Sequence, residues 1–218
     1  FAMPRSIDRA EEFVKQEAAE AIALLDMRVF NMDRHSGNLL LLRHEKPHGL
    51  GPIDHGCCLP PWWLLSEANF DAWCSWPQLQ CAPCQATRVL ARRAYDALPE
   101  TCNMVRDVGL DEDAILTLRL CTLFVRVGAA ELGLPCGRLA VLMLRDEETG
   151  FQELSWLETK VLASAAAAGA TCHMQVNDRG DQELVLDDGK SLQVDTFLAR
   201  LEDVFRAEMC EALQKMGC

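Results

Sequence analysis

The stretch that decides the fold begins with Asp33-Arg34-His35-Ser36-Gly37-Asn38 and ends with Ile53-Asp54-His55-Gly56. Between these two motifs, residues 38–42 form an apolar run of strand length, and residues 44–51 hold one proline and two glycines, as turns do. Residues 50–53 can pair back onto the first strand. We therefore expect a β-hairpin whose open end brings the two polar motifs together.

A long amphipathic helix is predicted to deliver the chain to the first motif. Apolar residues recur at helical spacing from Ile7 to Leu25, with glutamate and lysine on the other faces. Ser6 is suited to the N-cap, and Asp8 to the first turn.

The rest of the chain is predicted to be mainly helical, with a small amount of β-structure (α+β). After an irregular segment at residues 60–83, helices are expected at residues 86–98, 111–132, 135–145 and 154–168. Asp111 suits an N-cap, Pro135 a first helical position, and Gly133 and Gly169 the ends of helices.

The last fifty residues have a different pattern. Strands are predicted at residues 172–176, 183–186 and 191–194, with a turn at residues 187–190 between the last two. Asp195 is then expected to cap a final helix that reaches about Met216. Residues 170–218 are accordingly predicted to be an αβ extension of the body formed by residues 1–169.

Composition excludes several classes of protein. Half of the 218 residues are hydrophobic, which is enough to bury a core. The net charge of −12 argues against nucleic-acid binding and against electrostatic adhesion to anionic lipid. No apolar run reaches the ~18 residues of a transmembrane helix. The chain begins with Phe1 and shows no secretory signal, so we expect further sequence upstream and leave the compartment open.

Eleven cysteines are scattered along the chain. An odd number without a secretory signal favours reduced thiols in a reducing compartment. The one CxxC motif, Cys81 to Cys84, could form a zinc site with Cys57 and Cys58 or with Cys74. We favour the simpler interpretation, that these are small buried thiols.

The two opening motifs carry the chemistry of phosphoryl transfer. That reaction needs an aspartate that receives or orients the proton of the attacking hydroxyl, together with an asparagine and a second aspartate that hold Mg²⁺. Asp33, Asn38 and Asp54 supply these residue types on one hairpin. No glycine-rich loop or obvious phosphate-binding lysine precedes them in the sequence.

This arrangement resembles the phosphatidylinositol 3-/4-kinase superfamily. The resemblance is greatest to the type II-like phosphatidylinositol 4-kinases, especially the gamma group of plants and protists. It covers about residues 6–160, and its most specific parts are residues 25–38, 53–60 and 73–78. Residues 118–120, 128–134 and 143–146 look like the C-terminal helices of that group. The resemblance implies that residues 1–169 are the C-terminal lobe of a kinase-like fold, with a catalytic loop at residues 33–38 and a metal motif at residues 53–56.

The resemblance also implies a role for each motif residue. Asp33 would be the catalytic aspartate, and His35 would assist near the γ-phosphate or the acceptor. Arg34 would brace the catalytic loop, while Asn38 and Asp54 would hold Mg²⁺ and with it ATP. The family's N-terminal lobe, with its phosphate loop and lysine, should precede residue 1. We therefore expect weak or absent ATP binding by these 218 residues alone, and an apolar surface covered by the missing lobe or by a partner subunit.

Three functions follow as alternatives. The first is a phosphoinositide kinase acting on an inositol-ring hydroxyl, most simply the 4-hydroxyl. Residues 57–80 contain no lysine or arginine, so a singly phosphorylated headgroup fits better than a polyphosphorylated one. The second is a Ser/Thr protein kinase that uses the same residues. The third is a kinase-derived scaffold subunit of a larger assembly, without turnover.

Overall fold

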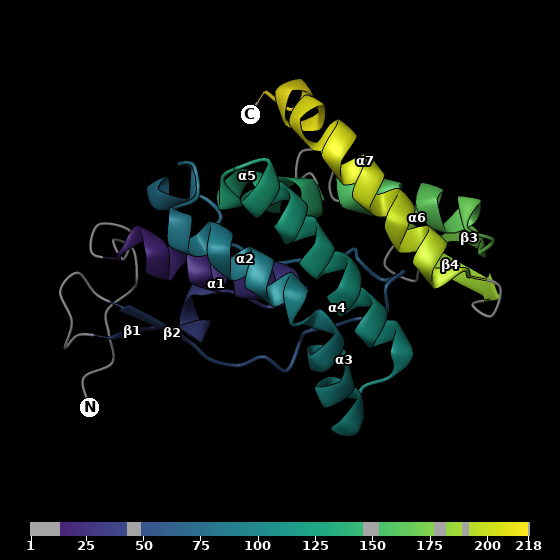
Figure 1. The fold of residues 1–218 in the computed structure, drawn as a ribbon, viewed down its shortest axis with the longest axis horizontal. Helices are drawn as coiled ribbons and strands as arrows, with labels where there is room; N and C mark the ends of the chain where they lie inside the picture. Colours follow the sequence, from purple (N-terminus) through teal and green to yellow (C-terminus); the bar gives the residue numbers. More distant parts are fainter. Residues whose placement is uncertain (1–13, 43–48, 146–152, 177–181, 189–191, 218) are drawn as a thin grey trace.

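The computed structural model describes residues 14–42, 49–145, 153–176, 182–188 and 192–217. This part of the chain is mainly helical with two small sheets, which confirms the predicted fold class (Figure 1). The elements are α1 (Gln16–Arg28), η2 (Ser36–Asn38), β1 (Leu39–Leu42), β2 (Gly49–Pro52), η3 (Pro77–Leu79), α2 (Gln85–Asp96), α3 (Leu98–Asp107), α4 (Glu112–Val125), η4 (Arg126–Glu131), α5 (Cys136–Met143), α6 (Trp156–Ala167), β3 (Thr171–Val176), β4 (Gln182–Asp188) and α7 (Val194–Lys215).

Two antiparallel hairpins lie at opposite ends of the long axis of the molecule in Figure 1. In the first, β1 pairs with β2, with Leu39 opposite Pro52 and Leu42 opposite Gly49. In the second, β3 pairs with β4 over Thr171–Val176 and Gln182–Asp188. The β1–β2 hairpin is the one expected from the sequence, and it holds both polar motifs at its open end.

Helix α1 is shorter than predicted. It begins at Gln16, and Lys15 before it is extended, with φ −64° and ψ 139°. Val14 is buried, and its carbonyl oxygen accepts a hydrogen bond from the Gln78 side chain, so this part of the chain is held by the irregular segment. The predicted helical start at Ser6 lies outside the described residues, but a continuous helix through residues 14 and 15 is excluded.

Helix α4 forms the centre of the body. Eleven of its fourteen residues are buried, and it contacts α1, α2, α3, η4 and α7. As predicted, Asp111 is its N-cap, with the carboxylate accepting a hydrogen bond from the amide of Ala114 at 2.8 Å. The helix predicted to reach residue 132 instead widens into the π-helical turn η4. There Gly128 lets α5 approach closely, since a Cβ atom would overlap the side chain of Leu139.

Three other parts of the prediction need correction. The helix predicted at residues 86–98 ends at Asp96 as α2, and residues 98–107 form a separate helix, α3, that was not predicted. Pro99 lies in the first turn of α3, where a backbone N–H has no partner within the helix. Residues 192–194 are not a strand, because Val194 begins α7 and β4 pairs with β3 instead. Asp195 lies in the first turn of α7, and Gln193 occupies the N-cap position without a side-chain cap bond.

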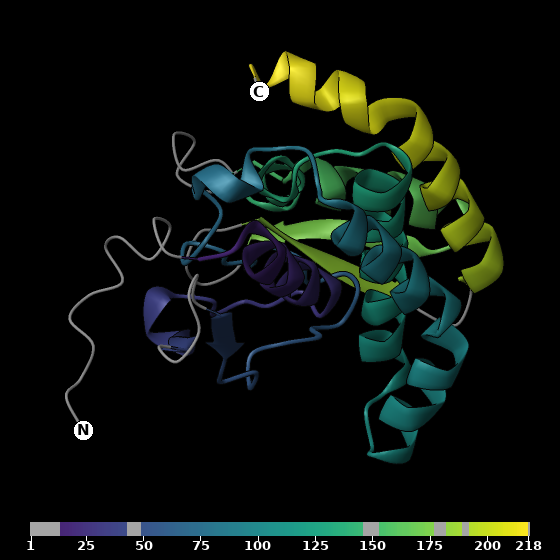
Figure 2. The same ribbon diagram turned by 60° about the vertical axis from the view of Figure 1, so that its left-hand side comes forward.

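Helix α7 packs along the outside of the helical body, as the yellow ribbon in Figure 2 shows. Its apolar face is buried, and the ring of Phe197 lies 5.3 Å from that of Trp62, while the ring of Phe205 lies 5.4 Å from that of Phe124. The contact between Trp62 and Phe197 packs the irregular segment onto α7. The division of the chain into residues 1–169 and 170–218 stays a prediction.

Candidate active site

The open end of the β1–β2 hairpin places the two polar motifs side by side. Asn38 ends the first motif directly before β1, and Asp54 follows β2. The amide of Ile53 donates a hydrogen bond to the carbonyl oxygen of Asn38 at 3.0 Å, which continues the pairing of the two strands by one step. A second link joins the amide of Met32 to the carbonyl oxygen of Cys57 at 2.9 Å.

Arg34 joins the two motifs through its guanidinium group. The side chain is fully buried, and its Nη1 donates to the carbonyl oxygens of Asn38 and Ile53, each at 2.7 Å. Its Nη2 lies 3.2 Å from Nε2 of His55. One cation therefore contacts the backbone on both sides of the hairpin opening and the histidine of the second motif.

The charge of Arg34 is balanced by Asp26 in the last turn of α1. Both side chains are 0% exposed, and Nε of Arg34 lies 2.9 Å from Oδ2 and 3.1 Å from Oδ1 of Asp26. The same carboxylate accepts from the indole N–H of Trp73 at 2.8 Å and from the side-chain nitrogen of Asn31 at 3.1 Å. The desolvation of this ion pair is thus offset by several hydrogen bonds.

Asp33 and His35 face solvent at the rim of the site. Their side chains are about half exposed, at 48% and 52%, and Oδ1 of Asp33 lies 4.0 Å from Nε2 of His35. The Nδ1 atom of His35 accepts a hydrogen bond from the amide of Gly37 at 3.1 Å. In a neutral ring the proton therefore belongs on Nε2, which is the nitrogen nearer the Asp33 carboxylate.

Asn38 is buried and tied to the same loop. Its side-chain nitrogen donates to the carbonyl oxygen of Asp33 at 3.0 Å. Because the nitrogen is committed to this bond, the oxygen is the atom that the Asn38 side chain can offer to a cation.

Asp54 adopts a backbone conformation that is uncommon for its residue type. Its φ angle is +54°, in the left-handed region that non-glycine residues seldom occupy. The residue is exposed, and its Oδ1 accepts a hydrogen bond from the amide of Gly56 at 3.3 Å. Strained conformations of this kind persist where the surrounding structure holds them, often at functional sites.

A scan with family models matches residues 6–88 to the family described as phosphatidylinositol 3- and 4-kinase. The match includes both motifs, the hairpin, and the segment that carries Trp73. Residues 6–88 belong to the phosphatidylinositol 3- and 4-kinase family. The resemblance stated from the two motifs is thereby confirmed.

Individual kinases of the plant gamma group are similar over a longer part of the chain. Phosphatidylinositol 4-kinase gamma 1 of Arabidopsis thaliana is 34% identical over 160 residues, which is 69% of this chain and 28% of that protein. Gamma 7 of the same plant is 35% identical over 146 residues, covering 63% and 21%. Gamma 4 of Oryza sativa subsp. japonica is 33% identical over 125 residues, covering 50% and 19%. The matched part thus spans less than a third of each of these kinases.

The kinase-family segment contains three residues whose contacts with the site were not foreseen: Asp26, Asn31 and Trp73. The sequence carries one signal for the first of them. Asp26 stands between Leu25 and Met27 near the end of an apolar helical stretch, where a charged side chain is rarely buried without a partner. Nothing in the sequence alone says that the partner is Arg34.

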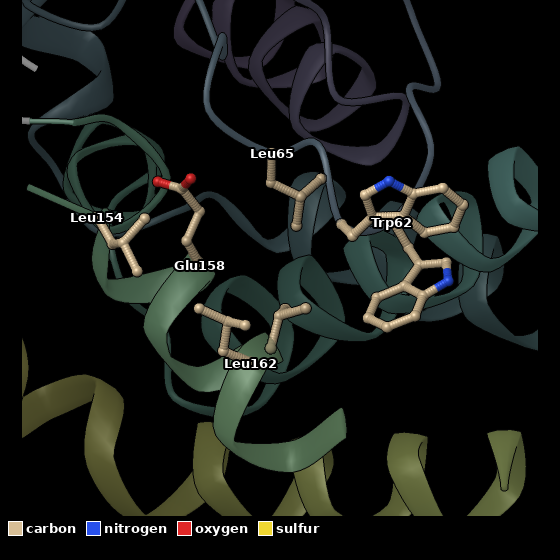
Figure 3. Close-up of a pocket in the computed structure, with 7 residues that line it drawn as sticks. Trp62, Leu65, Leu154, Glu158 and Leu162 are labelled. Carbon is tan, nitrogen blue, oxygen red and sulfur yellow. The ribbon is translucent and has the colours of Figure 1, made fainter. Parts of the chain in front are cut away.

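A small pocket lies outside the motifs of the kinase-family site. Figure 3 shows Trp62 and Leu65 of the irregular segment facing Leu154, Glu158 and Leu162 at α6. Its volume of about 10 Å³ holds about one water molecule, and none of the predicted site residues lines it. The pocket therefore offers no room for a nucleotide.

Every cysteine whose side chain the structure describes is a free thiol. Cys121 and Cys136 are buried, as expected, and burial raises the pKa of both thiols. Cys57, Cys81 and Cys210 are exposed, so the prediction of buried thiols is wrong for these three. The described residues hold no group of three His, Cys, Asp or Glu side chains that could bind a metal ion, which leaves the zinc alternative without support.

Burial raises the pKa of the Cys58 thiol to about 11, and the nearby carboxylate of Asp26 adds to this effect. At neutral pH Cys58 is therefore a protonated thiol beside the site and a poor nucleophile.

None of the helices in the described part of the chain is long and apolar enough to cross a membrane.

Proposed function

We propose that this chain supplies the acceptor-activating and metal-holding half of a phosphoinositide kinase, which transfers the γ-phosphate of ATP to the 4-hydroxyl of an inositol ring. The observation that carries the proposal is the buried Arg34, which contacts the carbonyl oxygens of Asn38 and Ile53 at 2.7 Å each. A kinase reaction needs its loop and its metal motif at a fixed separation, and these two bonds set that separation.

Each side chain takes a role that its surroundings support. The half-exposed Asp33 carboxylate receives the proton of the attacking hydroxyl, as a general base must reach solvent and substrate. Nε2 of His35, 4.0 Å from that carboxylate, carries a proton toward the same space and can donate it to a phosphate or acceptor oxygen.

The donor set of Asn38 and Asp54 fits Mg²⁺. One amide oxygen and one carboxylate are hard oxygen ligands, and Mg²⁺ is commonly held by one or two such groups together with phosphate oxygens and water. When bound, Mg²⁺ would neutralise charge on the β- and γ-phosphates. The left-handed backbone of Asp54 and the hydrogen bond from Gly56 fix where its carboxylate points.

Two exposed apolar side chains favour a nucleotide at this position. Leu40 is 45% exposed and Ile53 is 41% exposed, and both belong to the hairpin that carries the motifs. Such side chains on a strand pair form an apolar floor on which a planar base can lie. The apolar surface predicted to be covered by a first lobe or partner would include this pair.

The acceptor is inferred from the relatives and from charge. The gamma 1, gamma 5 and gamma 7 proteins are named phosphatidylinositol 4-kinases. The absence of lysine and arginine from residues 57–80 favours a headgroup with a single phosphate.

The proposal is tested by substitution in the natural full-length protein, assayed with Mg·ATP and vesicles containing phosphatidylinositol. Asp33→Asn is expected to abolish transfer and leave ATP binding nearly unchanged, while Asp54→Ala weakens Mg·ATP binding as well. Equal turnover in the wild type and both variants would reject these roles. Transfer to Ser/Thr peptides instead of lipid would establish the protein-kinase alternative, and a wild type without turnover would establish the scaffold.

A polypeptide of residues 1–218 alone is expected to bind Mg·ATP weakly and to show no turnover. Asn38 and Asp54 provide the metal-holding side of the site. Residues 1–218 contain no glycine-rich loop that would bind the phosphates of ATP. Isothermal titration with Mg·ATP measures this, and micromolar affinity with turnover would contradict the expectation.

A further inference from the structure

Asp26 lies outside both motifs, yet it is the residue on which their hydrogen bonds converge. It is 0% exposed. Its Oδ1 accepts from Asn31 and from Arg34, each at 3.1 Å, and its Oδ2 accepts from Arg34 at 2.9 Å and from Trp73 at 2.8 Å. A buried carboxylate with this many donors has a fixed position, and it fixes its donors in turn.

One branch from Asp26 reaches the metal-holding pair. The carboxylate holds Nε of Arg34, and Nη1 of the same planar group donates to the carbonyl oxygens of Asn38 and Ile53. Because a guanidinium group is rigid, fixing one edge of it fixes the other. The backbone of Asn38 and the peptide that joins Ile53 to Asp54 are thereby set relative to α1.

A second branch reaches the proposed base. Asn31 donates through its side-chain nitrogen to Asp26 and accepts through its Oδ1 from the amide of Asp33 at 2.9 Å. Its own carbonyl oxygen accepts from the amide of Asn69 at 3.1 Å. Asp33, the proposed base, is thus tied to the same carboxylate by an independent route.

We propose that Asp26 is a positioning residue of this site, which sets the separation between the base Asp33 and the metal-holding pair Asn38 and Asp54. The inference rests on the proposed function. Asp26 itself touches no reacting atom, and it acts through Arg34 and Asn31.

The test compares Asp26→Asn with Glu20→Gln in the natural full-length protein. Glu20 is a matched control because it is also buried on α1 and accepts several hydrogen bonds, from Gln16, Thr87 and the amide of Cys84. Those partners lie outside the two motifs. Both variants lose a buried charge, and only one of them is joined to the site.

Two measurements distinguish a positioning role of Asp26 from a contribution to the stability of the fold alone. Hydrogen exchange followed by mass spectrometry is expected to be faster in peptides covering residues 30–38 and 49–57 of Asp26→Asn, and unchanged there in Glu20→Gln. At a temperature where both variants are folded, kcat of Asp26→Asn should fall about a hundredfold, the effect of a misplacement on the order of 1 Å. Glu20→Gln should keep the wild-type kcat.

The possible outcomes separate the positioning role of Asp26 from the proposed kinase function. Equal exchange in the two variants, or equal kcat, would overturn the positioning role. Faster exchange at both motifs in a protein whose wild type lacks turnover would overturn the proposed function and leave the structural coupling standing.

Asn31→Ala keeps the proposal testable should Asp26→Asn fail to fold. This variant retains the ion pair and cuts only the branch to Asp33. Faster exchange is expected in the 30–38 peptide and not in the 49–57 peptide, together with a lower kcat. An equal response of both peptides, or of neither, would contradict two separate branches.

Discussion

The described part of the chain contains two buried arginine–carboxylate pairs, and the two pairs have different roles. Asp26 and Arg34 are both 0% exposed, and Arg145 and Glu158 are 3% and 8% exposed. Each arginine makes more than one bond to its carboxylate. The chemistry and the burial are alike, so the difference lies in what else each pair holds.

The Arg145–Glu158 pair supports the start of one helix. Glu158 completes a capping box, accepting from the amide of Ser155 at 2.8 Å, while the Ser155 hydroxyl accepts from the amide of Glu158. The Asp26–Arg34 pair instead joins the two motifs of the site, because Arg34 donates a hydrogen bond to the carbonyl oxygen of Ile53, nineteen positions away. A buried ion pair is therefore no sign of a site by itself; its further hydrogen bonds decide what it does.

The largest expected effect comes from removing one arginine from each pair. Arg34→Met and Arg145→Met should each lower the free energy of unfolding by about 3–5 kcal/mol, because each leaves a buried carboxylate uncompensated. Lipid-kinase turnover of the folded protein should be lost only in Arg34→Met. Urea unfolding and turnover measured on both variants test this, and equal turnover losses would remove the distinction between the pairs.

Replacing both partners sharpens the comparison. Asp26→Leu with Arg34→Met removes both charges, so much of the stability lost in the single variant should return. The return should be incomplete by about 1–3 kcal/mol, since the indole N–H of Trp73 and the side-chain nitrogen of Asn31 lose their acceptor. Turnover should not return, because the bonds to Asn38 and Ile53 are gone. A double variant with wild-type turnover would show that the site needs neither the ion pair nor the bridge, and that the single variant fails because a buried charge is left unpaired.

A smaller effect is expected at the helix that the second pair supports. Ser155→Ala removes the N-cap hydroxyl of α6 and should cost about 1 kcal/mol of stability. Turnover should be unchanged. Thermal unfolding combined with the kinase assay measures both, and a loss of turnover would show that α6 contributes to the site.

The smallest effect belongs to an ion pair near the surface. The hydrogen bond from Arg206, followed by the charge of Arg126, lowers the pKa of Glu131. A carboxylate with a lowered folded-state pKa contributes stability above its unfolded pKa of about 4.3 and loses that contribution as pH falls through the folded value. Glu131→Gln should remove this part of the pH dependence, worth less than about 1 kcal/mol. Unfolding of both proteins from pH 6 to pH 3 tests it, and parallel curves would contradict it.

Local signals in the sequence predicted much of the fold. The cap at Asp111 and the left-handed glycines Gly133 and Gly169 were each recognised from the residue type and its place in a pattern. Predictions failed where a distant contact overrides the local pattern. Val14 was expected to be helical, but its carbonyl oxygen accepts a hydrogen bond from the distant Gln78. A strand was expected at residues 191–194, but β4 pairs with β3 instead.

The candidate site shows the same limit. Asp33, Asn38 and Asp54 were identified because their residue types and spacing fit one reaction. Trp73 carries no such signal in the sequence, and the charge of Asp26 in an apolar stretch indicates only that it needs a partner. The contact between the two residues spans 47 positions and exists only in the folded chain. Motif reasoning finds residues that touch a substrate more readily than residues that hold those residues in place.

The π-helical turn η4 limits how many residues the segment between α4 and α5 can gain or lose. A π turn contains one residue more than an α turn, and here it presents the carbonyl oxygen of Ala130 to Arg88 at 3.0 Å and to Arg92 at 3.1 Å. Deleting one residue between 126 and 131 would allow a regular α-helix and would remove the wider turn that presents this carbonyl oxygen. Such a deletion would withdraw this acceptor from α2, so viable insertions and deletions should fall elsewhere in the chain.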